Sequence, residues 1–85
     1  MNNYIWTNHA QKRLKERDEI KIQWVIDTIE HPERLEFVVD GSGEKYHYYK
    51  RILEFDDRVL EVITSNSEPK RIISLYFNRN MRKQI

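Results

Sequence analysis

Three basic side chains recur every four residues near the start of the chain: His9, Arg13 and Arg17. At about 100° per residue they drift through an arc of only about 80°, so in a helix they share one face. Cationic side chains this close repel one another, and a bound phosphate would relieve the repulsion. The spacing therefore predicts a phosphate-binding face. The alternative is an exposed helix face that carries a capping histidine.

The first turn of this expected helix holds His9. There the positive end of the helix dipole favours the neutral form of an imidazole. A neutral imidazole can act as a general base near neutral pH, so His9 is the candidate acid–base residue.

A second group of candidates lies near the end of the chain, around the apolar run 71–77. Tyr76 could stack on a base or donate its hydroxyl, and guanidinium groups grip phosphate through two hydrogen bonds. With a period of two, Tyr76 and Ser74 share the more polar face of a strand with Ile72, whereas Ile73 belongs to the core face. The accompanying basic residues are Arg71, Arg79, Arg82 and Lys83. The alternative is a half-buried sheet tyrosine followed by a frayed basic tail.

Positive charge gathers at the two ends of a chain whose formal net charge is only +1. Residues 1–17, which include Lys12, hold four bases and one acid, and residues 69–85 hold five bases and no acid. Residues 18–68 hold thirteen acids and six bases. If the two ends meet in the fold, they form a basic patch suited to an anionic partner. Otherwise they decorate two separate solvated elements.

The segment 45–51 interleaves aromatic and basic side chains, as nucleic-acid stacking platforms do. Tyrosine is also a favoured strand residue, so a purely structural strand is the stronger interpretation. Arg51 is kept as a candidate phosphate contact. A metal site is a weaker hypothesis, because the three histidines lie on different expected elements and the chain has no cysteine.

The length of 85 residues, with 39% hydrophobic and 34% charged residues, predicts a single domain over 1–85. A small chain without cysteine fits a reducing, cytoplasmic setting. The opening residues do not resemble a signal peptide. No apolar run approaches the roughly 20 residues that span a membrane, so no membrane partner is expected.

Two helices are expected in the first part of the chain. Apolar residues of 22–30 recur at helical spacing on one face, and Pro32 ends that helix. The helix expected over 8–17 begins with Asn8 as its N-cap, and Gln11 completes a capping-box pattern.

The rest of the chain changes to the period of extended structure. A short edge strand over 4–6 is also compatible with the sequence, and the main strands are expected over 34–39, 45–55, 59–64 and 71–77. This order predicts an α+β fold in which two N-terminal helices pack on a four-stranded antiparallel meander sheet.

Three short motifs follow one another along the chain: His9-Ala10-x-x-Arg13-Leu14-x-x-Arg17, His31-Pro32-Glu33 and Arg71-Ile72-Ile73-Ser74. A basic tail follows the last motif. In this order of elements, over nearly its whole length, the chain resembles a small bacterial domain of the BrnT-like branch of the RelE-type toxins.

That resemblance implies a RelE-like fold and the toxin of a type II toxin–antitoxin system. Such a toxin is an endoribonuclease that needs neither metal nor cofactor, and a partner antitoxin protein silences it. The ribose 2′-hydroxyl attacks the adjacent phosphate, with His9 as base or acid and Arg13 and Arg17 holding the phosphate. Tyr76 and Arg79 would be the C-terminal contributors. The chain departs from BrnT proteins at Tyr76, where they usually carry arginine, and in its tail, which lacks their acidic residue.

Two other functions fit the same features. A non-catalytic module could use the basic patch to bind RNA or an acidic protein. A structural domain could instead pair one edge of its sheet with another chain.

Overall fold

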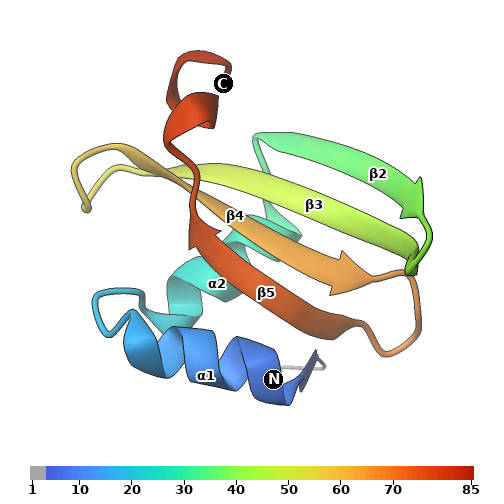
Figure 1. The fold of residues 1–85 in the computed structure, drawn as a ribbon. Helices are drawn as coiled ribbons and strands as arrows, with labels where there is room; N and C mark the ends of the chain where they lie inside the picture. Colours follow the sequence, from blue (N-terminus) through green and yellow to red (C-terminus); the bar gives the residue numbers. More distant parts are fainter. Residues whose placement is uncertain (1–3) are drawn as a thin grey trace.

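The computed structural model describes residues 4–85 and shows two helices on one face of a five-stranded sheet (Figure 1). The helices are α1 (Asn8–Glu16) and α2 (Ile22–Glu30). The strands are β1 (Ile5–Trp6), β2 (Arg34–Asp40), β3 (Gly43–Ile52), β4 (Arg58–Ser65) and β5 (Arg71–Phe77), and a 3₁₀ helix, η1 (Arg79–Lys83), follows. The expected α+β class is confirmed.

The sheet has the order β1-β5-β4-β3-β2. Strands β2 to β5 form the expected antiparallel meander, but β1 runs parallel to β5, with Ile5 beside Arg71 and Trp6 beside Ile72. Backbone hydrogen bonds hold β1 there, from Ile5 N to the oxygen of Lys70 at 2.9 Å and from Thr7 N to that of Ile72 at 3.2 Å. The sheet is therefore five-stranded and mixed. The four-stranded antiparallel sheet expected from the sequence did not include the parallel pairing of β1.

The core lies between the helices and one face of the sheet, because the apolar faces of both helices can be buried only there. Its buried residues are Ala10, Ile20, Trp24, Val25, Ile29, Tyr48, Ile52, Leu60, Val62, Ile72 and Leu75. Successive strand residues point to opposite faces, so the alternate side chains form a second face, which neither α1 nor α2 covers (Figure 1). We call this second surface the open face.

The N-cap of α1 is Thr7, not Asn8 as expected from the sequence. The Thr7 hydroxyl accepts a hydrogen bond from Ala10 N at 3.1 Å and donates one to the backbone oxygen of Ile72 at 2.9 Å. A threonine at this position caps the helix and binds β5 at the same time, whereas Asn8 is already helical. The first helix is thereby fastened along the last strand.

An irregularity in β5 changes which isoleucine enters the core. The pairing with β4 passes from Ile63 opposite Ser74 to Thr64 opposite Ile72, so Ile73 is the extra residue of a bulge. Ile72 is consequently fully buried while Ile73 is only half-buried, the reverse of the expectation from strict alternation.

Strand β3 ends at Ile52, earlier than expected, because residues 53–57 form a turn that brings Arg58 opposite Ile52; Asp56 and Asp57 have positive φ angles within it. Among residues 4–85, no helix is long and apolar enough to cross a membrane.

Candidate functional site

The open face carries a row of polar side chains at its centre. Tyr49 on β3 lies opposite Glu61 on β4, and Glu61 lies opposite Tyr76 on β5. His47 precedes Tyr49 by two residues and so shares this face. We call His47, Glu61, Tyr76 and Asn78 the Glu61 cluster.

Glu61 is the centre of this cluster and is only 2% exposed. Its Oε2 lies 2.7 Å from Nδ1 of His47, and Asn78 donates from Nδ2 to Oε1 at 2.8 Å. The hydroxyl of Tyr76 also hydrogen-bonds to this carboxylate. A buried carboxylate is tolerated only when hydrogen bonds replace its lost hydration, and here three side chains provide them.

The contact with Glu61 orients the imidazole of His47. A carboxylate beside Nδ1 favours the tautomer that carries its proton on Nδ1, which leaves the lone pair on Nε2. The His47 side chain remains 20% exposed. This arrangement of imidazole and carboxylate is the one that orients a general base toward a substrate.

Two tyrosines beside the carboxylate keep their protons to high pH. Burial, followed by the hydrogen bond and the negative charge of Glu61, raises the pKa of Tyr76 to about 12, and the positive charge of Arg13 partly opposes this shift. Burial also raises the pKa of Tyr49, whose hydroxyl donates to Oε1 of Glu36 at 3.0 Å. Both hydroxyls are therefore hydrogen-bond donors near neutral pH.

Arg13 links α1 to this face, since its charge acts on the Tyr76 hydroxyl. Within residues 4–85, its Nε is buried and has no hydrogen-bond partner. A buried donor without an acceptor is costly, and a bound anion would supply one. The chemistry here thus combines an oriented imidazole with an arginine whose Nε lacks an acceptor within residues 4–85.

The other candidate residues that the sequence predicted for the first helix lie on different parts of the surface. His9 and Arg17 are exposed. His9 lies one turn before Arg13 on the same flank of α1, but Arg17 is the C-cap, past the end of the helix at Glu16, so the helix expected over 8–17 is one residue too long and Arg17 does not continue that flank. Lys12 is also exposed, but it lines a separate pocket with Trp6 and Ile22.

The basic tail does not join α1. Arg79, Arg82 and Lys83 belong to η1, which lies at the opposite side of the molecule from α1 in Figure 1. Arg82 donates from one of its terminal nitrogens to the backbone oxygen of Asp56 at 2.9 Å. Arg71 is exposed at the start of β5, whereas Tyr76 lies near its end. The basic residues of η1 therefore do not form a single patch with those of α1.

Arg51 holds the tail in place. Its Nη1 lies 2.9 Å from Oδ2 of Asp57, and its Nη2 donates to the backbone oxygens of Arg82, at 2.6 Å, and Ile85. Its guanidinium is thus engaged in contacts within the chain, which makes a simultaneous phosphate contact harder than the sequence suggested.

The sequence interpretation missed Glu61 and Asn78 and treated His47 as part of a structural strand. Two signals were available, the first being that Glu61 is the lone acid within an apolar strand. Alternation along β3 also places His47 on the same face as Tyr49 and Arg51. Neither signal shows that His47 and Glu61 meet.

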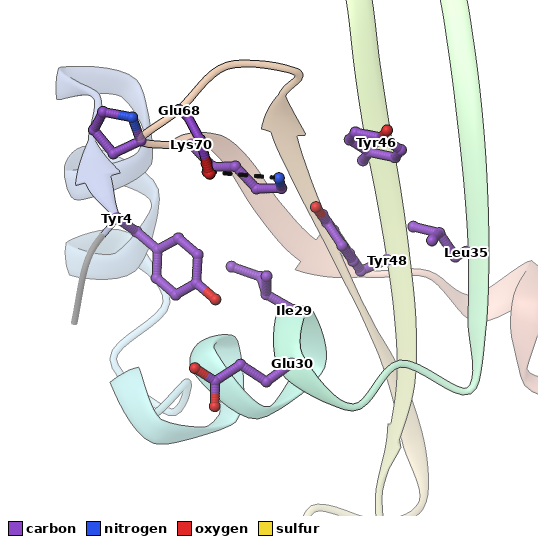
Figure 2. Close-up of a pocket in the computed structure, with 9 residues that line it drawn as sticks. Tyr4, Ile29, Glu30, Leu35, Tyr46, Tyr48, Glu68 and Lys70 are labelled. Atoms are coloured by element: carbon purple, nitrogen blue, oxygen red, sulfur yellow. Dashed lines mark ion pairs between the residues drawn. The ribbon is translucent and has the colours of Figure 1, made fainter. Parts of the chain in front are cut away.

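A pocket of about 710 Å³ lies on the helix side of the sheet, away from the Glu61 cluster (Figure 2). Tyr4, Tyr46 and Tyr48 contribute aromatic walls, and two acids, Glu30 and Glu68, also line it. Lys70 lies 4.0 Å from Glu68 in an ion pair. Its excess of acids makes this pocket unsuited to a polyanion. Across residues 4–85, no group of three histidine or acidic side chains forms a metal-binding cluster.

One protein-family model matches the chain over residues 6–77, that of DUF4258, a domain of unknown function. The match takes in both helices, all of β2 to β5 and the Glu61 cluster except Asn78. No curated protein and no solved structure matches the chain.

Proposed function

The chain belongs to the DUF4258 family, a domain of unknown function, and we propose that it is a metal-independent endoribonuclease, the toxin of a type II toxin–antitoxin pair. The observation that carries this proposal is the contact of His47 with Glu61 at 2.7 Å, beside a Tyr76 hydroxyl on which the positive charge of Arg13 acts. Two N-terminal helices followed by an antiparallel meander also agree with the RelE-like arrangement that the sequence resembles.

In this proposal, Nε2 of His47 removes the proton of a ribose 2′-hydroxyl. The 2′-oxygen then forms a bond to the adjacent phosphorus, and the bond from phosphorus to the 5′-oxygen breaks. Glu61 holds the imidazole in the required tautomer and stabilises it once it is charged. General base catalysis of this kind contributes about 10²–10⁴-fold in rate.

Arg13 supplies the cationic donor that this reaction needs. Negative charge builds up on the phosphate oxygens in the transition state, and a fixed guanidinium stabilises it. The phosphate would in turn give Nε of Arg13 the acceptor it lacks within the chain. Tyr76 positions the carboxylate of Glu61, because its raised pKa keeps its proton on the hydroxyl.

His9 and Arg17 extend the site along α1 in this proposal. Arg17 contacts a neighbouring phosphate, and His9, when charged, protonates the leaving 5′-oxygen. Lys12, Arg71, Arg79, Arg82 and Lys83 contact the RNA backbone outside the reacting centre, which would make binding strongly dependent on salt.

The proposal is tested by inducing the chain in a bacterial host without its partner and following growth and cellular RNA. In parallel, the purified protein is incubated with single-stranded RNA and a metal chelator. We expect growth arrest, and cleavage in the chelator that leaves 2′,3′-cyclic phosphate ends. Normal growth with abundant folded protein and intact RNA would overturn the proposal. RNA binding without cleavage would instead support a non-catalytic module of the same fold.

A further inference from the structure

Strand β2 forms one edge of the sheet and exposes an apolar row. Leu35, Phe37 and Val39 point to the helix side and are 52%, 51% and 65% exposed. Figure 2 shows Leu35 beside Tyr46 and Tyr48 at the wall of the helix-side pocket, where no helix covers it. Charged side chains, prolines and bulges protect many edge strands from pairing with another chain. β2 has no proline or bulge, and its charged residues Arg34, Glu36 and Asp40 all lie on the open face, away from the apolar row.

The backbone of the same three residues faces outward. Asp40 and Gly43 are paired across a two-residue turn, and such a pair exchanges both of its backbone hydrogen bonds. Bonding then alternates along the strand, so Asp40, Val38 and Glu36 bond to β3. Leu35, Phe37 and Val39 direct their N–H and C=O groups to the open edge, where no strand of residues 4–85 pairs with them.

We propose that this edge pairs antiparallel with β2 of a second copy of the chain, with Phe37 opposite its own counterpart. In that register Leu35 faces Val39 of the second copy, and Arg34 faces Asp40, each twice by symmetry. The outward backbone groups of the three apolar residues then bond to one another across the two-fold axis.

The charges at the ends of β2 favour a second copy over an unrelated strand. Arg34 and Asp40 have opposite charges, and their side chains are 40% and 50% exposed. Opposite charges facing each other across strands are stabilising, and like charges are destabilising. The register centred on Phe37 is also the one that pairs all seven residues of β2. A register shifted by two residues pairs only five residues of each copy and no longer places Arg34 opposite Asp40.

The two-fold axis of such a pair runs perpendicular to the sheet. The apolar rows of the two copies therefore lie side by side on the helix side, and both open faces point in the same direction. No residue of the Glu61 cluster takes part, so this pairing does not depend on the proposed function.

Disulfide formation tests the register directly, because the natural chain has no cysteine. The variant Phe37→Cys places two thiols opposite each other, at the separation of about 5.5 Å between Cα atoms that a disulfide accepts. Leu53→Cys is the control, since Leu53 is 77% exposed but lies outside β2. We expect Phe37→Cys to form disulfide-linked dimers at least tenfold faster than Leu53→Cys. Equal rates would overturn the proposed register.

A charge exchange tests the same interface without cysteine. Arg34→Asp and Asp40→Arg each place two like-charged pairs across the axis, so each should weaken self-association in sedimentation equilibrium about tenfold. A mixture of the two variants restores both attractive pairs and should form the heterodimer, and the double variant should again self-associate. Circular dichroism confirms that each variant is folded. A wild-type chain that stays monomeric at high concentration, or a mixture that fails to associate, would overturn the proposal.

Discussion

The Nδ1 atom of His47 lies 2.7 Å from Oε2 of Glu61, and the Glu61 side chain is only 3% exposed. The two residues are fourteen positions apart and meet because β3 and β4 pair side by side. Removing the carboxylate and removing the imidazole should therefore have different consequences. Loss of the carboxylate should lower stability and, under the proposed function, should also slow cleavage, whereas loss of the imidazole should affect mainly chemistry.

Glu61→Ala should lower the free energy of unfolding by about 2–4 kcal/mol, because it leaves His47, Asn78 and Tyr76 without their shared acceptor. Glu61→Gln keeps one acceptor oxygen and should cost less. Urea denaturation measures both changes. Glu54→Ala is the matched control, since Glu54 is exposed in the turn between β3 and β4. Equal stabilities for all three variants would contradict the role of Glu61.

Alkaline pH should destabilise the protein through Tyr76. Its folded pKa of about 12 lies above the ordinary value of 10.0, so its contribution is fully present below pH 10. That contribution is lost as the pH rises through about 12. Tyr76→Phe should be less stable than the wild type near neutral pH and should lose less stability over this window. Urea denaturation at several pH values across this window measures the free energy of unfolding of both proteins. If stability falls equally with pH in the wild type and in Tyr76→Phe, the prediction is contradicted.

Thr7→Ala removes the N-cap of α1, which by itself should lower the free energy of unfolding by about 1 kcal/mol. The total loss should be somewhat larger, because the hydrogen bond to Ile72 is lost as well. Asn8→Ala should change stability by less than about 0.5 kcal/mol. The comparison of the two denaturation midpoints decides between Thr7 and Asn8 as the cap. A larger effect at Asn8 would refute the observed helix start.

Arg51→Ala should release the tail, because Arg51 binds the backbone of Arg82 and Ile85. Hydrogen exchange over residues 79–85 should become faster, while exchange in β4 should change little. Lys50→Ala is the neighbouring control. Unchanged exchange in the tail would show that Arg51 does not hold it.

Periodicity and proline placed the regular elements well. The observed bounds of α2 and β5 match those expected from apolar spacing and Pro32. Two features were not predicted from the sequence, because they depend on contacts between distant segments. Thr7 is the cap partly because β5 offers it an acceptor, and the bulge at Ile73 comes from pairing with β4.

The candidate site was only partly visible in the sequence. The spacing of His9, Arg13 and Arg17 indicated a basic helix face, and strand alternation placed Tyr76 on the polar face. The effect of the Arg13 charge on Tyr76 depends on how α1 packs along β5, and the His47–Glu61 contact depends on the strand register. The basic tail does not lie beside α1, because Arg82 bonds to Asp56 in the turn after β3, and Arg51 pairs with Asp57 of the same turn.

The central claim is that His47, held by Glu61, performs acid–base chemistry on RNA. Its most direct test is the single-turnover cleavage rate of single-stranded RNA, measured in a metal chelator. His47→Gln keeps a donor for Glu61 but cannot take a proton, so its rate should fall by about 10²-fold or more. Its affinity for an uncleavable 2′-deoxy analogue should stay unchanged. His31→Gln, at the exposed end of α2, should cleave like the wild type. Full cleavage by folded His47→Gln would contradict the claim.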